Sequence, residues 1–232
     1  MNIVISGATS GIGYQSALRF AEDEGNTVFA LGRRSELLQE LVESKTRGYI
    51  IPVVTDISSY DFRVLEVALK KAGTTAIDIV IHNAGLLINK PFELLTGTDW
   101  EEMYRVNVIG AAQLTRFLLP FLGKEKTSHL VTIGSIGGVR GSLKFPGLSA
   151  YSSSKGALGI LTECLAEEFK GRGITVNCLA LGSVQTEMLT KAFPGYTGSM
   201  EPLEVSRLIY DFSTTGWKHF NGKILEVSTT NP

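Results

Sequence analysis

The chain has 232 residues, of which 44% are hydrophobic and 19% charged, and its net charge is −1. This length suits one substantial core, and the composition is that of an ordinary globular protein with no nucleic-acid or membrane partner. Because the sequence opens directly on an apolar run, we expect a cytoplasmic protein without a signal peptide. We also expect no metal site. Cys164 and Cys178 are expected to be small buried residues without a disulfide.

Short apolar runs alternate with longer amphipathic stretches along the chain. The predicted strands are 3–6, 27–31, 49–55, 78–82, 129–134, 175–179 and 223–227, and the predicted helices are 12–23, 35–44, 60–72, 100–122, 151–170 and 201–212. The alternation predicts an α/β fold, a Rossmann-like doubly wound domain over residues 1–232 whose seven-stranded parallel sheet has helices on both faces. Thr98 and Glu101 resemble a capping box for the helix at 100–122, which Pro120 should end or kink.

A glycine-rich turn links the first predicted strand to the first predicted helix. Its candidate binding residues are Gly7, Thr9, Ser10, Gly11, Ile12 and Gly13. Ligands of open α/β sheets bind beyond the carboxyl ends of the strands, where free N–H groups and the helix dipole attract pyrophosphate. Glycines let the backbone approach the phosphates closely. The turn therefore predicts a dinucleotide site, and the alternative is a turn that serves packing alone.

Two arginines follow the second predicted strand. An acidic residue at this point would bind a ribose 2′-hydroxyl and favour NAD(H). The chain instead has Gly32, followed by Arg33 and Arg34, and guanidinium groups pair well with phosphate. We therefore favour NADP(H), with NAD(H) possible. The alternative is that both arginines only begin a solvated helix.

Tyr151 and Lys155 lie one turn apart on the helix predicted at 151–170. A free phenol has a pKa of ~10 and is a poor proton donor near neutrality. A lysine ~4 Å away, at an effective dielectric of ~20, would favour the phenolate by roughly 4 kcal/mol. That corresponds to about 3 pKa units, which would suit acid/base catalysis. A solvated surface pair is the alternative when this motif stands alone.

With the glycine turn, these motifs make the chain similar to the single-domain short-chain dehydrogenase/reductases. The run Ser6 to Gly13 resembles that family's Thr-Gly-x-x-x-Gly-x-Gly, with a leading serine. The resemblance places the catalytic residues, in chain order, at Asn107, Ser135, Tyr151 and Lys155. It places further cofactor-binding residues at Asp56, Ile57, Asn83, Ala84, Gly85, Gly182, Val184 and Thr186, besides Tyr151 and Lys155.

This resemblance implies an oxidoreductase that interconverts a small ketone or aldehyde and an alcohol. The coenzyme would deliver hydride to the carbonyl carbon, while Ser135 stabilises the alkoxide and Tyr151 protonates it. Lys155 would lower the pKa of the phenol and hold the nicotinamide ribose, and Asn107 would position a water for proton resupply. A homodimer or homotetramer joined through the fourth and fifth predicted helices is also implied.

The chain departs from the family pattern at several positions. Leu181 stands where the family has proline, which predicts a less rigid loop. His82 replaces an asparagine and is expected to form hydrogen bonds at a strand end. The extra segment 140–145 is expected to form part of a substrate wall, and 187–200 a short, partly apolar lid.

Two other functions stay open. A 3-oxoacyl-thioester reductase is the alternative among enzymes, although no basic patch for an acidic carrier protein is evident near the lid. From another class, the chain could be an NADP-binding regulator that has lost catalysis. The complete set of four catalytic residues favours the enzyme.

Overall fold

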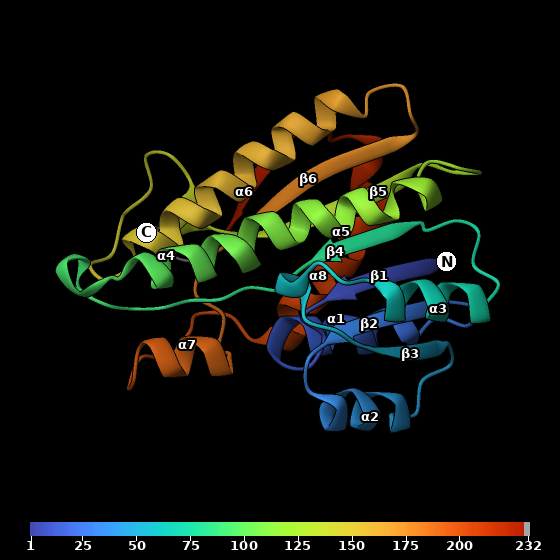
Figure 1. Cartoon of the computed structure of the whole chain (residues 1–232), viewed down its shortest axis with the longest axis horizontal. Helices are drawn as coiled ribbons and strands as arrows, with labels where there is room; N and C mark the ends of the chain where they lie inside the picture. Colours follow the sequence, from blue (N-terminus) through green and yellow to red (C-terminus); the bar gives the residue numbers. More distant parts are fainter. Residues whose placement is uncertain (230–232) are drawn as a thin grey trace.

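The structure is a computed structural model that describes residues 1–229, so the last three residues of the predicted domain lie outside it. Its centre is a seven-stranded sheet in the order β3-β2-β1-β4-β5-β6-β7, with every neighbouring pair parallel (Figure 1). The strands are β1 (Asn2–Ser6), β2 (Thr27–Gly32), β3 (Tyr49–Val54), β4 (Ile79–His82), β5 (Ser128–Ser135), β6 (Ile174–Leu181) and β7 (Ile224–Val227). Each predicted strand is confirmed, with ends shifted by no more than two residues.

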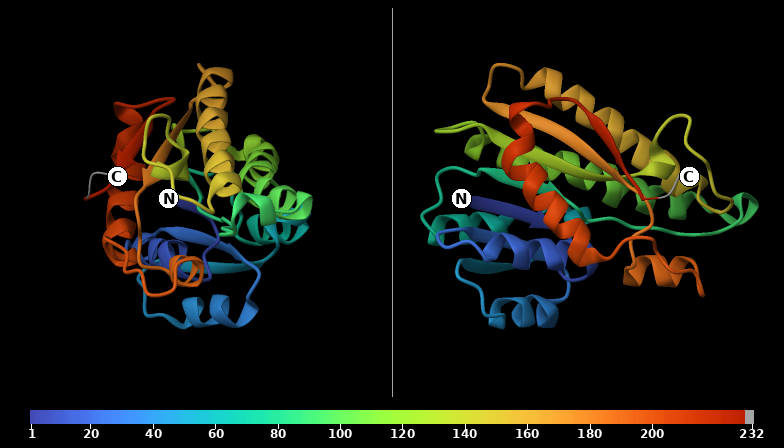
Figure 2. Two further views of the ribbon diagram at one scale, coloured as in Figure 1. Left: turned by 90° about the vertical axis from the view of Figure 1, so that its left-hand side faces the viewer. Right: turned by 180° about the vertical axis from the view of Figure 1, so that it is seen from behind.

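Helices cover both faces of this sheet, as the alternating pattern predicts (Figure 2). They are α1 (Gly11–Ala21), α2 (Ser35–Glu43), α3 (Arg63–Lys71), α4 (Gly97–Tyr104), α5 (Ala111–Leu118), α6 (Ser149–Glu168), α7 (Glu187–Ala192) and α8 (Pro202–Thr215). One buried cluster joins α1, α2 and α8 to the sheet through residues such as Phe20 and Ile209. A second joins α3, α5 and α6 to the other face through residues such as Leu65 and Leu114.

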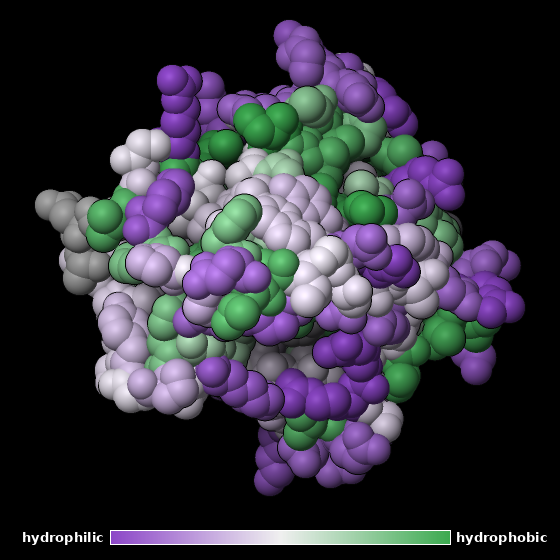
Figure 3. Space-filling model, turned by 60° about the vertical axis from the view of Figure 1, so that its left-hand side comes forward, coloured by the Kyte–Doolittle hydropathy of each residue, from purple (hydrophilic) through white to green (hydrophobic). Residues whose placement is uncertain are grey.

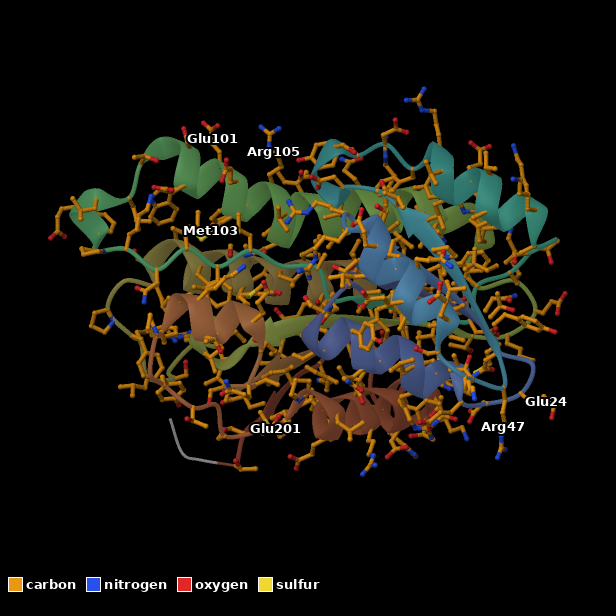
Figure 4. All side chains as sticks on the ribbon, turned by 90° about the horizontal axis from the view of Figure 1, so that it is seen from below. Glu24, Arg47, Glu101, Met103, Arg105 and Glu201 are labelled. Atoms are coloured by element: carbon orange, nitrogen blue, oxygen red, sulfur yellow. The ribbon has the colours of Figure 1, made fainter. Side chains whose placement is uncertain are left out.

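The helix predicted at 100–122 is a composite of α4, a π-helical turn η3 (Arg105–Gly110), and α5. The predicted capping box is wrong, because the box is formed by Thr96 and Asp99, which exchange hydrogen bonds at the start of α4. Pro120 does end the helix, since α5 stops at Leu118 and a 3-10 turn follows. Met103 points toward the protein in Figure 4 and is buried, while its labelled neighbours Glu101 and Arg105 point outward.

Two further expectations are corrected. The helix predicted at 60–72 begins at Arg63, because Tyr60 adopts a left-handed conformation with φ of 59° and ends the short 3-10 helix η1 (Ile57–Ser59). Cys178 is buried as expected, but Cys164 lies exposed on α6. Both thiols are free.

The chain order reverses direction between β1 and β4, which are neighbours in the sheet. Such a switch point opens a crevice beyond the carboxyl ends of the strands. These ends lie at the left of Figure 1, and α7 lies beyond them. Figure 3 shows this side, where a hollow lies among hydrophilic and hydrophobic side chains. No described helix has the length and apolar character needed to cross a bilayer.

Candidate active site

The glycine turn brings the start of α1 against the carboxyl end of β1. Gly7 and Gly11 have φ of +71° and +53°, conformations that favour glycine. A Cβ on Gly13 would lie 2.2 Å from the Gly7 carbonyl oxygen, so no side chain fits there. Ser10 is the N-cap residue of α1, and its hydroxyl makes no capping hydrogen bond within the described chain. The first-turn N–H groups of α1 are therefore left for a ligand at the helix N-terminus, where an anion is favoured.

Side chains at the end of β4 hold this turn in place. The Nδ2 of Asn83 donates to the Ser6 and Gly7 carbonyl oxygens at 3.2 and 3.1 Å. The Ser6 hydroxyl in turn accepts from the backbone N–H of Asn83 and of Ala84, both at 3.1 Å. Ser6, which replaces the family's threonine, thus keeps the function of a hydroxyl that ties two strand ends together. Ile12 belongs to the core beneath the turn.

Arg34 lies across the glycine turn. Its Nε and Nη2 both donate to the Thr9 hydroxyl at 3.3 Å, and its Nη1 donates to Glu187 on α7 at 3.2 Å. Arg33 is mostly exposed and lies 3.8 Å from the Asp56 carboxylate. Close packing requires glycine at position 32, because a Cβ there would lie 2.3 Å from the Thr9 Cγ2. Both arginines therefore follow the end of β2 and have acidic partners, and Arg34 is the one that contacts the glycine turn.

Asp56 and Ile57 stand beside this end of the sheet. The Asp56 carboxylate accepts from the backbone N–H and the hydroxyl of Ser58, which fixes the short helix η1. Ile57 is buried and meets the π turn, where a Cβ on Gly110 would lie 3.0 Å from its Cγ1. Their expected contact with an adenine stays a prediction.

Asn107 lies in the middle of the π-helical turn η3, a feature that often marks functional sites. Its Nδ2 donates to the Leu86 carbonyl oxygen and to the Ser154 hydroxyl, each at 2.9 Å, and its Oδ1 accepts from the Leu86 N–H at 2.7 Å. Both amide protons are thus committed to the protein, and one lone pair of Oδ1 is left for a water. A Cβ on Gly85 would lie 3.5 Å from both this Oδ1 and the Lys155 Nζ, so the two groups flank Gly85.

Ser135, Tyr151 and Lys155 meet where β5 ends against the first turns of α6. The Ser135 side chain interacts with the Tyr151 hydroxyl and lowers the pKa of the phenol. The Lys155 ammonium is buried, donates to the Ile133 carbonyl oxygen at 2.8 Å and lies 5.9 Å from the centroid of the Tyr151 ring. The four residues expected to be catalytic therefore surround one end of the crevice, next to the glycine turn.

The predicted lowering of the Tyr151 pKa is wrong for the protein without ligand. Burial raises the pKa of Tyr151 to about 12, and the Ser135 hydrogen bond offsets this only in part. Burial also lowers the pKa of Lys155 to about 8. The prediction placed the ammonium directly beside the phenol, whereas it is bonded to the Ile133 carbonyl. Desolvation therefore dominates over attraction at both groups.

Leu181, which stands where the family has proline, belongs to the sheet. It is the last residue of β6 and pairs with Ser135 on β5 and Val227 on β7. Strand pairing on both sides holds the backbone of Leu181, and the effect of the missing proline on the following loop stays a prediction. A Cβ on the following Gly182 would lie 2.9 Å from the Ser228 hydroxyl, which keeps this position small.

Residues 183–200 form a loop that returns on itself and contains the predicted lid, 187–200. Val184 and Met200 form an isolated parallel β-bridge, which holds the two ends of this loop together. Thr186 caps α7 by accepting from the Leu189 N–H at 3.2 Å, and its methyl group would lie 3.0 Å from a Cβ on Gly11. The lid therefore starts in contact with the glycine turn. The helix α7 itself was not among the predicted helices.

The far end of the lid is tied to the loop after β4. The Nδ2 of Asn89 donates to the Ala192 carbonyl oxygen, the last of α7, at 2.8 Å. Asn89, Glu187, Ser6 and Ser154 were not predicted as site residues. Ser6 lies at the head of the glycine-turn motif, whereas no local pattern marks the other three, each of which gains its role from a partner distant in sequence.

The extra segment 140–145 lines a pocket of about 570 Å³ against Ser152 and Gly156 of α6. At 100° per residue, these two positions do not share the helix face of Tyr151. The pocket thus opens on another side of α6 than the phenol, and the expected substrate wall stays a prediction.

His82 is buried and bonded through Nε2 to the Thr115 hydroxyl at 2.8 Å, which confirms it as a hydrogen-bonding residue at a strand end.

Comparison with known proteins identifies the family. A family model described as short chain dehydrogenase matches residues 1–197. The chain belongs to this family. It is accordingly an oxidoreductase, a dehydrogenase or reductase that acts on CH–OH or carbonyl groups.

Individual relatives agree with this short-chain dehydrogenase assignment. The 3-oxoacyl-(acyl-carrier-protein) reductase FabG of Thermotoga maritima is 32% identical over 192 residues, covering 81% of this chain and 76% of that protein. A 3-ketoacyl-(acyl-carrier-protein) reductase from Brucella melitensis, complexed with NADH, has a TM-score of 0.86 at 26% identity, with coverage of 97% and 96%. The closed form of serine dehydrogenase complexed with NADP+ has a TM-score of 0.83 at 29% identity, with coverage of 98% and 94%.

Proposed function

We propose that this chain is an NADP(H)-dependent oxidoreductase that reduces a small ketone or aldehyde to an alcohol, and runs the reverse reaction, within a single domain over residues 1–232. The observation that carries the proposal is that Ser135 and Tyr151 meet beside the buried Lys155 ammonium, 5.9 Å from the centroid of the phenol ring, at the crevice that the glycine turn opens. A hydroxyl pair next to a cation can bind a carbonyl oxygen and supply a proton to it.

The site residues would act as follows. When bound, the coenzyme supplies a hydride to the carbonyl carbon. Ser135 donates a hydrogen bond to the carbonyl oxygen, and Tyr151 transfers its phenolic proton to that oxygen as negative charge develops. The ammonium of Lys155 stabilises the phenolate left behind. A water held at the free lone pair of the Asn107 Oδ1 would return a proton toward Lys155.

Burial raises the pKa of Tyr151 to about 12, so the phenol carries its proton near neutral pH, as reduction requires, but it is a weak acid. Proton transfer to the developing alkoxide therefore depends on Lys155, whose ammonium stabilises the phenolate that forms. The reverse reaction needs the phenolate. Oxidised nicotinamide carries a positive charge, and its presence near the phenol would favour that form.

The glycine turn and the two arginines support a dinucleotide with a 2′-phosphate. The open first turn of α1 suits a pyrophosphate, and the positive φ values of Gly7 and Gly11 allow close approach. Arg33 and Arg34 offer two guanidinium groups at the end of β2, where an acidic residue would select NAD(H). Relatives of this fold include one complexed with NADH and one with NADP+, so the arginines carry the preference.

A second candidate is a 3-oxoacyl-thioester reductase. It is favoured by the names of relatives from Thermotoga maritima and Brucella melitensis.

We further propose a homodimer or homotetramer joined through η3 and α6. Ile109 on η3 and Ile160 on α6 are both exposed, at 42% and 58%, and these two elements are in contact. Light scattering after size-exclusion chromatography tests the assembly.

The test of the proposed reaction uses the full chain with NADPH, a panel of ketones and aldehydes, and a 3-oxoacyl thioester. We expect turnover of at least one carbonyl compound, measured by coenzyme absorbance. Tyr151→Phe should abolish turnover and leave NADPH binding intact, whereas Tyr49→Phe, at an exposed position on β3, should change neither. Turnover confined to the thioester would favour the second candidate. NADPH binding without any turnover would favour a regulator.

The test of the coenzyme preference compares the dissociation constants of NADPH and NADH. We expect tighter binding of NADPH, and a smaller ratio between the two constants in Arg33→Ala and Arg34→Ala. Equal constants for the wild-type protein would overturn the NADP(H) preference and leave the reaction class untouched.

A further inference from the structure

The lid helix α7 touches the phosphate-binding side of the crevice through one ion pair. The Oε2 of Glu187, the first residue of α7, accepts from the Nη1 of Arg34 at 3.2 Å. The same guanidinium is anchored on the glycine turn, since its Nη2 and Nε donate to Thr9. These residues are 153 positions apart along the chain, so the pair links two elements that only the fold brings together.

The carboxylate of Glu187 is well placed to stay ionised. Lys191, one turn further along α7, donates to its other oxygen at 2.7 Å. Hydrogen bonds from Lys191 and Arg34 lower the pKa of Glu187. The negative charge is therefore present at neutral pH, at the point where a dinucleotide with a 2′-phosphate would bring further negative charge.

We propose that Glu187 determines coenzyme specificity, because its carboxylate competes with the 2′-phosphate of NADP(H) for the Arg34 guanidinium. This inference rests on the proposed role of Arg34 as a phosphate ligand. Three nitrogen atoms of Arg34 are engaged, Nε and Nη2 toward Thr9 and Nη1 toward Glu187. A phosphate that binds Nη1 and Nη2 together must displace Glu187 or share the guanidinium with it. NADH carries no such phosphate and leaves the pair intact.

The structure limits how large this effect is. The side chains of Arg34 and Glu187 are 42% and 47% exposed, and exposed ion pairs contribute little to stability. We therefore expect a change of about two- to five-fold in the affinity for NADPH, and a smaller change for NADH. The lid keeps its other attachments when the pair is removed, namely the contact of Thr186 with Gly11 and the hydrogen bond of Asn89 with Ala192.

The experiment measures the dissociation constants of NADPH and NADH for the wild-type protein, Glu187→Gln, Arg34→Ala and the double variant. Glu187→Gln should tighten NADPH by about two- to five-fold and raise the NADPH-to-NADH preference. In the Arg34→Ala background the same substitution should leave that preference unchanged, because the residue it acts through is gone. Glu201→Gln removes an equal charge before α8 and serves as the matched control.

The possible outcomes distinguish a failure of the proposed role of Glu187 from a failure of the proposed NADP(H) preference. A wild-type preference for NADPH that Glu187→Gln leaves unchanged, or lowers, overturns the role of Glu187 alone. An increase that persists in the Arg34→Ala background shows a general effect of charge and also overturns it. No wild-type preference for NADPH overturns the proposed coenzyme itself.

Discussion

The side chain of Asn107 is clamped to α6 by a hydrogen bond from its Nδ2 to the Ser154 hydroxyl at 2.9 Å. Ser154 is completely buried, and its hydroxyl donates a hydrogen bond to the backbone carbonyl oxygen of Tyr151 at 2.7 Å. The residue immediately before Lys155 thus connects the π turn to the helix that carries the phenol and the ammonium. This contact fixes the distance between the two halves of the catalytic set.

Ser154→Ala should therefore impair catalysis without touching the reacting groups. It leaves a buried N–H of Asn107 without an acceptor, which costs about 1–3 kcal/mol. We expect a lower melting temperature and a several-fold lower kcat with nearly unchanged KM for the coenzyme. Ser153→Ala is the matched control, because the Ser153 hydroxyl bonds only to Ala150 within its own helix. Equal kinetics for the two variants would contradict the clamp.

Coenzyme binding should weaken as the pH rises through about 8. Burial lowers the pKa of Lys155 to about 8, so its positive charge is present below that pH and is lost above it. One charge ~6 Å from an anionic group, at an effective dielectric of ~40, contributes about 1.4 kcal/mol, or up to about tenfold in affinity. NADPH titrations from about pH 7 to about pH 9.5 should show this loss.

Lys155→Met should remove the pH dependence and bind NADPH weakly throughout. Lys170→Met, which removes an exposed ammonium bonded to Glu167, should retain it. A dissociation constant of the wild-type protein that stays level across this range would show that the Lys155 charge does not govern coenzyme binding.

Local patterns in the sequence predict the sheet, and the resemblance to the short-chain dehydrogenase/reductases predicts which residues are catalytic. Buried parallel strands are runs of branched apolar residues, and the ends of such strands lie along one edge. That rule alone brings Ser135 and the glycine turn to one crevice. Tyr151 and Lys155 follow from helical spacing, since their helix abuts the end of β5.

Other features depend on tertiary structure and leave no local trace. The π turn around Asn107 interrupts a helical pattern that reads as continuous, and α7 is too short for periodicity to reveal it. The pairing of Arg34 with Glu187 spans 153 positions. The pKa of Tyr151 was predicted in the wrong direction, because desolvation depends on what covers the phenol and not on spacing along the helix.

Acid should destabilise the fold through two buried histidines. Burial lowers the pKa of both His82 and His129 to about 4. In the unfolded chain a histidine has a pKa of ~6.5, so between these values the unfolded state binds more protons than the folded state. The free energy of unfolding should therefore fall as the pH falls, by about 2 kcal/mol for each histidine at about pH 5.

Hydrogen bonds show why His129 stays neutral. Its Nδ1 donates to the Ser213 carbonyl oxygen at 3.0 Å, and its Nε2 accepts from the Asn177 amide at 3.0 Å. A second proton would remove the acceptor at Nε2. Urea unfolding at about pH 7 and about pH 5 should show a smaller loss of stability in His129→Gln than in the wild type. His219→Gln, at an exposed position, is the control, and equal losses for His129→Gln and the wild type would contradict this assignment.

Gly32 should resist substitution because the glycine turn packs directly over it. A Cβ there would lie 2.3 Å from the Thr9 Cγ2, closer than any real contact. Gly32→Ala should lower the free energy of unfolding by about 1–3 kcal/mol, and this loss should nearly vanish in a Thr9→Gly background. Gly97→Ala, whose new Cβ meets no described atom within 4 Å, should be neutral or slightly stabilising.

The same contact limits how the coenzyme preference can be changed. A carboxylate at position 32 is the feature expected to select NAD(H), but Gly32→Asp alone should yield a destabilised protein with poor affinity for both coenzymes. Combined with Thr9→Gly, it should fold and bind NADH more tightly than NADPH, as measured by thermal unfolding and coenzyme titration. A stable Gly32→Asp single variant would show that the Thr9 side chain moves aside easily. Glycine at position 32 would then be explained by coenzyme selection and not by the close contact with Thr9.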